Sequence, residues 1–267
     1  MKKKRRLNFL RDSFKIFIKS FKKINIHLLF VIIMDLLFFV FIFIASLIAN
    51  KILTKQALKL QSLPMDTLSL EVDQAQDILK SVSNFVVGML ITIGLLMIFI
   101  ILNWSFFKYL IWNLVVNGKI QLKNFWKFLL ANIVWFFIWL VPFVLTFYPL
   151  FLMVKLGQLQ KPPLFPIIAM SIVLCAALHF TYLYYIGFIK ENHIGKAIAF
   201  AFKTGTVKIK FLLLPYLFVF VSFAIISSII YPVKFLPDKA SFLISLIVFV
   251  VYVGWLRFYI SSVVQTT

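Results

Sequence analysis

Acidic residues are scarce in this sequence, which holds eight Asp and Glu against 28 Lys and Arg. A membrane enzyme that handles phosphate normally gathers several carboxylates around Mg²⁺. Asp12 and Glu191, the two acids in segments that we expect to be cytoplasmic, lie far apart in the chain. The acids at positions 66, 71, 73 and 77 match no Ca²⁺ loop. The scarcity of acids therefore argues against a carboxylate-based active site.

Cysteine and histidine are rare as well. Cys175 is the only cysteine, so the chain forms no intramolecular disulfide, and His27, His179 and His193 lack the spacing of a metal site. The sequence also lacks the nucleophile elbow, the phosphate-binding loop, the dinucleotide-binding glycine pattern and the zinc-protease helix motif. We therefore predict that the protein is not an enzyme and holds no metal or cofactor.

Hydrophobic residues, in contrast, make up 63% of the chain, and charged residues make up 13%. A soluble core of this length does not hide so much apolar surface. Uncharged runs of about 20 residues or more recur along the chain, which is typical of transmembrane helices. We predict an all-α polytopic membrane helix bundle with six transmembrane helices. Their approximate ranges are 28–49, 85–107, 128–154, 162–189, 211–233 and 240–262.

The Lys and Arg residues are distributed unevenly between the loops. Twenty lie in residues 1–27, 108–127 and 190–210 or at Arg257, and eight lie in residues 50–84, 155–161 and 234–239. Short cytoplasmic loops carry the excess of positive charge in membrane proteins. We therefore predict a multi-pass protein of a prokaryotic cell (plasma) membrane, with both termini in the cytoplasm (N-in and C-in).

An amphipathic helix is predicted before the first span. Large apolar residues recur there at spacings of three and four, while basic residues fill the other face. This pattern is typical of an interfacial helix that turns its lysines toward anionic head groups. The alternative is that the positive charge only enforces topology. The apolar residues are Leu7, Leu10, Phe14, Phe17, Phe21 and Ile24, and the basic residues are Arg11, Lys15, Lys19, Lys22 and Lys23.

No linker or second domain is visible in the sequence, so residues 1–267 are predicted to form a single integral membrane domain. Residues 1–27 form its basic cytoplasmic amphipathic segment. The only sizeable polar stretch, residues 50–84, is predicted to be an external helical loop that is interrupted at Pro64. Its second helix is expected to begin near residue 70. This loop is a candidate contact surface.

Two segments that lead into spans resemble a known group of families. Residues 14–23 follow the pattern FKxxxKSFKK, and residues 195–218 are GKAIAFAFKTGTVKIKFLLLPYLF. Together with the six-span length, they resemble the prokaryotic six-helix membrane families related to the glycerophosphodiester phosphodiesterase membrane domain. This resemblance implies a membrane-embedded module that occurs alone or beside an enzyme domain. It assigns no functional residue.

Asp35 is an ionisable residue inside a predicted span, where a charge is expensive and needs compensation. It lies about 10 Å from the expected cytoplasmic boundary, and His179 lies about 15 Å from the same boundary. One hypothesis is that the two residues face each other as a protonatable pair, flanked by Thr181, Tyr182 or Tyr185, along the path of a proton or a polar solute. The alternative is that Asp35 only holds neighbouring helices together.

Lys108 and Arg257 lie at the cytoplasmic ends of the second and sixth predicted spans, close to aromatic residues. Cations and aromatic residues at that depth are ordinary interfacial anchors. The alternative is that the two cations form a pocket for a lipid head group.

The function that we expect is that of a non-catalytic, lipid-interacting accessory or scaffold protein. The alternative is a small-solute or proton-coupled transporter that uses Asp35 and His179. Anionic lipids are the expected partners, and the protein partners left open are another membrane protein or a second copy of the chain. The basic N-terminus has no fold for base readout beside it, so nucleic acid is not expected.

Overall fold

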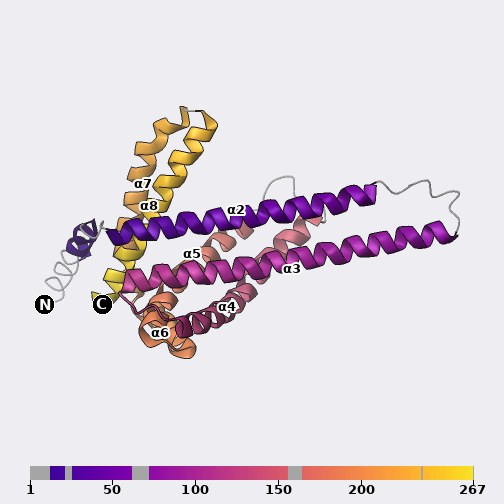
Figure 1. Ribbon diagram of the computed structural model, residues 1–267. Coiled ribbons are helices and arrows are strands. Elements are labelled where there is room, and N and C mark those ends of the chain that lie inside the picture. The colour runs from indigo at the N-terminus through magenta and orange to yellow at the C-terminus, as the bar shows by residue number, and fades with distance from the viewer. Residues whose placement is uncertain (1–12, 22–25, 62–71, 156–163, 236, 267) are drawn as a thin grey trace. The chain divides into compact units, whose positions relative to one another are not determined.

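The computed structural model describes residues 13–21, 26–61, 72–155, 164–235 and 237–266 (Figure 1). The described part of the chain is all-helical and contains no strand. Residues 13–21 are helical, and they precede the longer helices. These are α2 (Ile26–Gln61), α3 (Val72–Val116), α4 (Leu122–Lys155), α5 (Leu164–Glu191), α6 (Ile194–Val207), α7 (Ile209–Ile230), the 3-10 helix η1 (Tyr231–Phe235) and α8 (Asp238–Thr266).

Six of these helices are long and apolar enough to cross a membrane, which confirms the predicted number of spans. The apolar stretches are Ile26–Leu58, Ile78–Val116, Leu122–Pro149, Ile168–Glu191, Leu212–Val233 and Ala240–Thr266. The predicted external loop is also helical at both of its ends, where α2 continues to Gln61 and α3 begins at Val72. Its middle, residues 62–71, lies outside the described residues.

The chain divides into two compact units. The core unit consists of Met1–Asp35 and Lys108–Thr267, and the hairpin unit consists of Leu36–Phe107. The hairpin unit is built from parts of α2 and α3. Within it, the side-chain amide of Asn103 donates to the carbonyl of Phe38 at 3.4 Å, and Gln56 lies against Gly88. Most of its large aliphatic side chains are exposed.

The core unit, in contrast, has a dense aromatic centre. Trp112 of α3, Phe128 of α4, Tyr184 of α5 and Tyr259 of α8 are almost completely buried. The rings contact one another in stacked, tilted and edge-on pairs, such as Trp255 and Tyr259, whose centroids lie 5.5 Å apart. Such pairs add about 0.5–1.5 kcal/mol beyond the burial of their area. The aromatic centre therefore fixes how the helices of this unit pack.

The segment between the fourth and fifth spans is a helix rather than the expected loop. Asn192 has a φ of 49°, a left-handed conformation that asparagine tolerates, and this residue ends α5 and allows α6 to turn back. Gly187 of α5 lies opposite Phe200, and Gly205 of α6 lies opposite Phe180, so α6 returns antiparallel along α5. The missing Cβ atoms of the two glycines allow this close approach.

Candidate functional site

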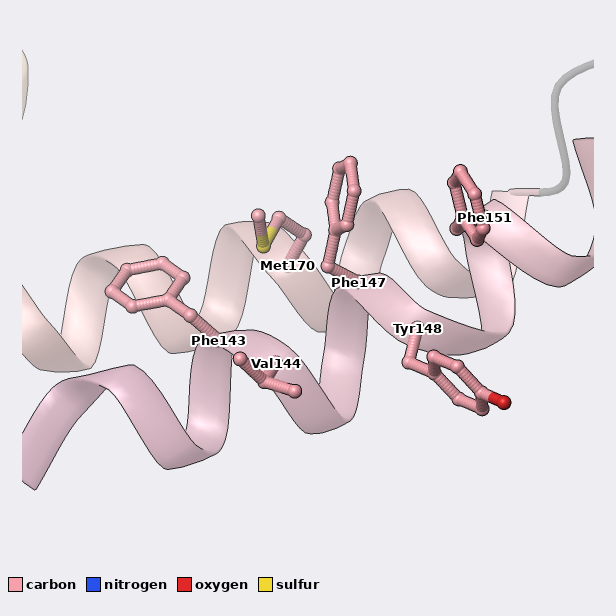
Figure 2. A pocket seen from close by; sticks show the side chains of 6 residues that line it. All are labelled: Phe143, Val144, Phe147, Tyr148, Phe151 and Met170. Carbon is pink, nitrogen blue, oxygen red and sulfur yellow. The ribbon is translucent and has the colours of Figure 1, made fainter. Parts of the chain in front are cut away.

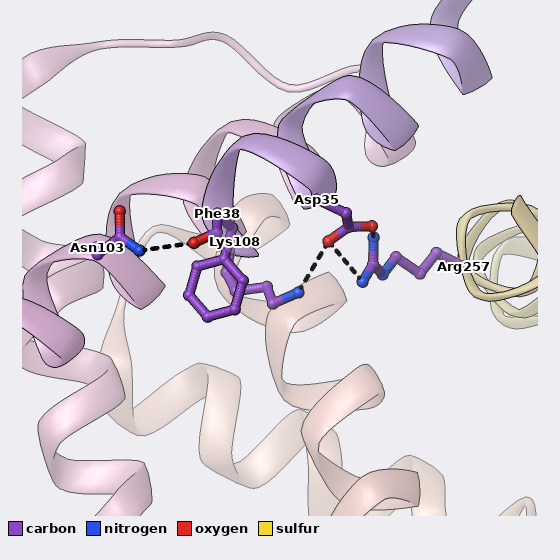
Figure 3. A network of polar contacts seen from close by, with 5 residues as sticks. All are labelled: Asp35, Phe38, Asn103, Lys108 and Arg257. Atoms are coloured by element: carbon purple, nitrogen blue, oxygen red, sulfur yellow. Dashed lines mark hydrogen bonds and ion pairs between the residues drawn. The ribbon is translucent and has the colours of Figure 1, made fainter. Parts of the chain in front are cut away.

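The candidate site is a cluster of three charged residues in the core unit, which we call the charge cluster: Asp35 of α2, Lys108 of α3 and Arg257 of α8 (Figure 3). Lys108 Nζ lies 3.2 Å from Asp35 Oδ1, and Arg257 Nη2 donates to the same oxygen at 3.1 Å. Arg257 Nη1 donates to Asp35 Oδ2. The guanidinium therefore binds the carboxylate with two parallel hydrogen bonds, the strongest geometry for such a pair.

All three charged residues are buried in the protein. Asp35 is 4% exposed, Lys108 8% and Arg257 5%. Removing charges from water costs several kcal/mol per ion, and only close pairing with further hydrogen bonds compensates for this. Two cations share one carboxylate here. The cluster thus joins three helices through one acid.

The close approach of α2 and α8 depends on a glycine of α8 and on the residues that face it from α2. Gly254 lies one turn before Arg257, and a Cβ atom on it would lie 3.1 Å from Leu28 Cδ1 of α2. Leu28, Val31 and Asp35 follow one another at spacings of three and four, so they share one face of α2. Leu28 and Val31 are buried. The glycine therefore lets the two helices approach closely enough for the Arg257–Asp35 pair to form.

His179 of α5 belongs to a different group of residues. Its Nδ1 lies 2.6 Å from the hydroxyl of Tyr216 of α7, and its Nε2 lies 3.4 Å from the carbonyl oxygen of Gly205 of α6. A carbonyl only accepts hydrogen bonds, so Nε2 carries the proton, and a neutral imidazole then accepts from Tyr216 at Nδ1. The histidine links α5 to the junction of α6 and α7 at Lys208.

The structure therefore gives Asp35 and His179 different partners. Lys108 and Arg257 neutralise Asp35, and Tyr216 and Gly205 bind His179. This arrangement differs from the hypothesis of a facing pair. The structure brings Asp35 together with Lys108 and Arg257 and gives His179 other neighbours.

The other predicted polar residues of α5 point toward several neighbours. Thr181 accepts a hydrogen bond from Trp135 Nε1 at 2.8 Å, and the Trp135 ring stacks on Tyr184 with centroids 4.3 Å apart. Tyr182 lies edge-on to Trp112, and Tyr185 packs against Trp112 and Phe128. Thr181, Tyr182 and Tyr185 thus contribute to the aromatic packing of the core unit.

Lys108 and Arg257 do not lie where the sequence predicts. The sequence predicts that both are interfacial anchors or ligands of a lipid head group. In the structure they lie inside the protein on Asp35, where they neutralise a carboxylate that would otherwise be buried without a partner. Lys108 and Arg257 are therefore unavailable to a head group.

Lys15 and Lys19 are exposed, whereas Lys22 and Lys23 lie outside the described residues. The helix of residues 13–21 places Phe17 among Trp255 and Tyr259 of α8 and Phe218 of α7. Ser20 is buried and accepts a hydrogen bond from Trp255 Nε1 at 3.1 Å. The side of the helix that carries Phe17 therefore packs on the protein itself.

Two clefts lie along the helix pairs of the core unit. One, of about 360 Å³, lies between α4 and α5 and is lined by Phe143, Val144, Phe147, Tyr148, Phe151 and Met170 (Figure 2). The other, of about 850 Å³, lies between the outer parts of α7 and α8, where Ser227, Ser228 and Ser245 accompany apolar residues. Asp35 and His179 line neither cleft.

A signal for the true partner of Asp35 was present in the sequence. Asp35 and Arg257 are the only charges inside the six predicted spans. Arg257 lies five residues before the end of the last predicted span, at a depth of about 8 Å, which nearly matches that of Asp35. Charged residues inside membrane spans usually pair with one another, and a pair needs two residues of opposite charge at similar depth.

The described residues contain no group of three or more His, Cys, Asp or Glu side chains that could hold a metal ion. No family model, curated protein or solved structure matches this chain.

Proposed function

We propose that this protein is a non-catalytic membrane module that serves as a lipid-interacting accessory or scaffold protein of the plasma membrane. The observation that carries this proposal is the charge cluster. Its acid is held by two hydrogen bonds from Arg257 and by Lys108, within a densely packed part of the core unit.

A carrier that uses an intramembrane acid has to let that acid exchange partners with a proton, an ion or a solute. The carboxylate of Asp35 already has both oxygens bound by cations from two other helices. Breaking a buried pair of this kind costs about 3–5 kcal/mol when one partner is removed. The geometry is suited to fastening α2, α3 and α8 together, and this supports a structural role for the cluster.

The lipid-interacting part of the proposal is supported by the outer surfaces of the helices. Many large aliphatic residues of the described spans are exposed, among them Leu90, Leu95 and Ile98 of α3. Both clefts are lined mostly by apolar atoms and run along pairs of spans. Surfaces of this kind take acyl chains or apolar side chains of a neighbouring membrane protein.

A proton-coupled or small-solute transporter is the second candidate, and one observation favours it. The α6–α7 segment is broken at Lys208, and His179 contacts the helices on both sides of the break, at Gly205 of α6 and at Tyr216 of α7. Discontinuous helices frequently surround the binding sites of transporters.

The two functions are separated by reconstituting the full chain into sealed liposomes that contain a pH-sensitive dye. We expect proton flux after a pH jump to equal that of protein-free liposomes, and we expect the Asp35→Asn and His179→Phe variants to behave in the same way. In the same preparations, mass spectrometry of retained lipids should show a composition different from that of the bulk bilayer. Flux that requires Asp35 or His179 would establish the transporter instead.

A further inference from the structure

Two turns between helices lie side by side in the core unit. The turn from α3 to α4 covers residues 117–121, and the turn from α5 to α6 covers residues 192–193. The side-chain amide of Asn192 donates to Asn124 Oδ1 at 2.9 Å, and a Cβ atom on Gly118 would lie 2.6 Å from Ile189 Cγ2. Tyr109 fixes the first turn by bonding both the N–H and the carbonyl of Gln121. The two turns therefore form one continuous surface.

This surface, which we call the basic turn surface, carries five exposed lysines. They are Lys119, Lys123 and Lys127 from the α3–α4 side and Lys190 and Lys196 from the α5–α6 side. Glu191 is the only acid between residues 78 and 237 of the sequence. Its carboxylate lies 3.9 Å from Lys196 Nζ, and both side chains are exposed, so the pair is weak. The surface keeps a strong positive charge.

The stability of the helices does not account for two of these lysines. Lys123 lies in the first turn of α4 and Lys196 in the first turn of α6, and neither first turn contains an acid. The N-terminal end of a helix carries a partial positive charge, which favours acids and disfavours lysines there. Lys190 differs, because it lies in the last turn of α5, where a cation is favourable.

Apolar residues alternate with the lysines on the α3–α4 side. Ile120, Leu122 and Trp126 are exposed, Leu122 to 75% and Trp126 to 57%. The apolar span of α4 begins at Leu122, and that of α5 ends at Glu191, so the surface lies where two spans end. Tryptophan and lysine together at such a position are typical of the interface between acyl chains and head groups. This composition favours a lipid over an acidic soluble protein.

We propose that the basic turn surface is a binding site for the phosphate head group of an anionic glycerophospholipid. The lysines contact the phosphate, and Ile120, Leu122 and Trp126 contact the glycerol and the upper acyl chains. This inference rests on the proposed lipid-interacting function and names its ligand and its site. It also places head-group binding on lysines other than the buried Lys108 and the exposed Lys15 and Lys19.

The test uses the full chain in nanodiscs that contain phosphatidylcholine and phosphatidylglycerol. Native mass spectrometry counts the lipids that remain bound as the nanodisc is stripped. The first variant is Lys123→Gln/Lys127→Gln/Lys190→Gln, and the matched control is Lys15→Gln/Lys19→Gln, which removes exposed lysines from the N-terminal helix. Since these side chains are exposed, both variants should unfold close to the thermal midpoint of the original protein. The loss of Lys190 from the last turn of α5 should lower this midpoint only slightly.

We expect phosphatidylglycerol to be enriched on the original protein, and we expect its enrichment to fall about tenfold or more in the triple variant, because each lysine near an anionic surface adds to the attraction. The control variant should retain most of the enrichment. An excess of inorganic phosphate should not displace the lipid, since the apolar contacts belong to the lipid alone.

If the enrichment survives in the triple variant but disappears in the control, the site lies on the N-terminal helix. That result would overturn this inference and leave the proposed function standing. Enrichment that both variants retain also overturns the inference. If the original protein shows no enrichment of any lipid over the bulk bilayer, the lipid-interacting function itself fails.

Discussion

In a soluble protein the buried residues are the more apolar ones, but among the spans of this protein the most buried are the least apolar. The most apolar window of α3 has 0% of its residues buried, whereas 44% of the window of α8 is buried. Of the six candidate spans, α5 and α8 have the lowest mean hydropathy, and they are also the two most buried. The two most buried spans are therefore the two least apolar ones.

The physical reason is the solvent. Lipid tails are as apolar as leucine, so an aliphatic residue gains little by leaving lipid for the protein interior. Residues that stack or hydrogen-bond gain more from a protein partner. Trp135 illustrates this, because its ring stacks on Tyr184 while its Nε1 donates to Thr181.

The largest effect is expected at the charge cluster. Asp35→Ala leaves two buried cations without their acid and should lower the free energy of unfolding by about 3–5 kcal/mol. The double variant Asp35→Ala/Arg257→Ala should lose clearly less than the sum of the two single variants, because each single variant strands a charge. Denaturant titration in detergent micelles measures all three, with Lys190→Ala as an exposed control. Strictly additive losses would show that the pair is not coupled.

The next effect compares two positions on one helix. Trp112 is buried and Leu95 is exposed, and both lie on α3. Trp112→Ala should cost about 3–5 kcal/mol, since it leaves a cavity among aromatic rings. Leu95→Ala should cost less than about 0.5 kcal/mol, because the side chain is exposed in the structure and leaves no cavity. The same unfolding titration measures both. Equal losses at the two positions would contradict the division into buried and exposed segments.

A smaller effect is expected where α6 packs on α5. Gly205→Val places a branched side chain against Phe180 and His179 and should cost about 1–3 kcal/mol through overpacking. Gly94 is the matched control, because a Cβ atom added to it would meet no other side chain within 4 Å. Thermal unfolding of the two valine variants compares them directly. The antiparallel packing of α6 on α5 is disproved if the Gly205 variant is as stable as the Gly94 variant.

The smallest effect is expected at the His179–Tyr216 hydrogen bond. Tyr216→Phe removes the hydroxyl and should cost about 0.6 kcal/mol, the average for such bonds between transmembrane helices. Tyr148→Phe is the control, since that side chain is exposed. The ¹⁵N resonances of the His179 imidazole should shift in the Tyr216 variant and stay constant in the control. Unchanged resonances in both variants would argue that the bond does not form in the membrane.

Much of the fold followed from the pattern of apolar residues. The six spans and the helical ends of the 50–84 segment agree with the structure, because long uncharged runs have few alternatives to a helix. The sequence predicts a loop at residues 190–210, where the structure has a helix that folds back. This packing depends on Gly187 of α5 and Gly205 of α6, whose importance depends on which side chains lie opposite them.

The candidate site was predicted only in part. The sequence showed that Asp35 needs compensation, since a carboxylate inside a span is costly. It did not show the partner, and depth alone suggested His179. Arg257 is 222 residues away from Asp35 in the chain, and Gly254 allows its helix to approach α2. In the sequence, Lys108 has the position of an interfacial anchor, and its contact with Asp35 is visible only in the structure.

The sequence by itself determined that the chain is helical, that it carries six apolar spans and that one carboxylate inside them requires a partner. These properties depend on hydrophobicity and helix length, which each segment carries alone. The tertiary structure decided which cations bind Asp35, that Tyr216 binds His179, and which lysines share one surface. Those contacts join residues far apart in the chain, and they depend on how aromatic side chains and glycines set the distance between helices, which no local pattern encodes.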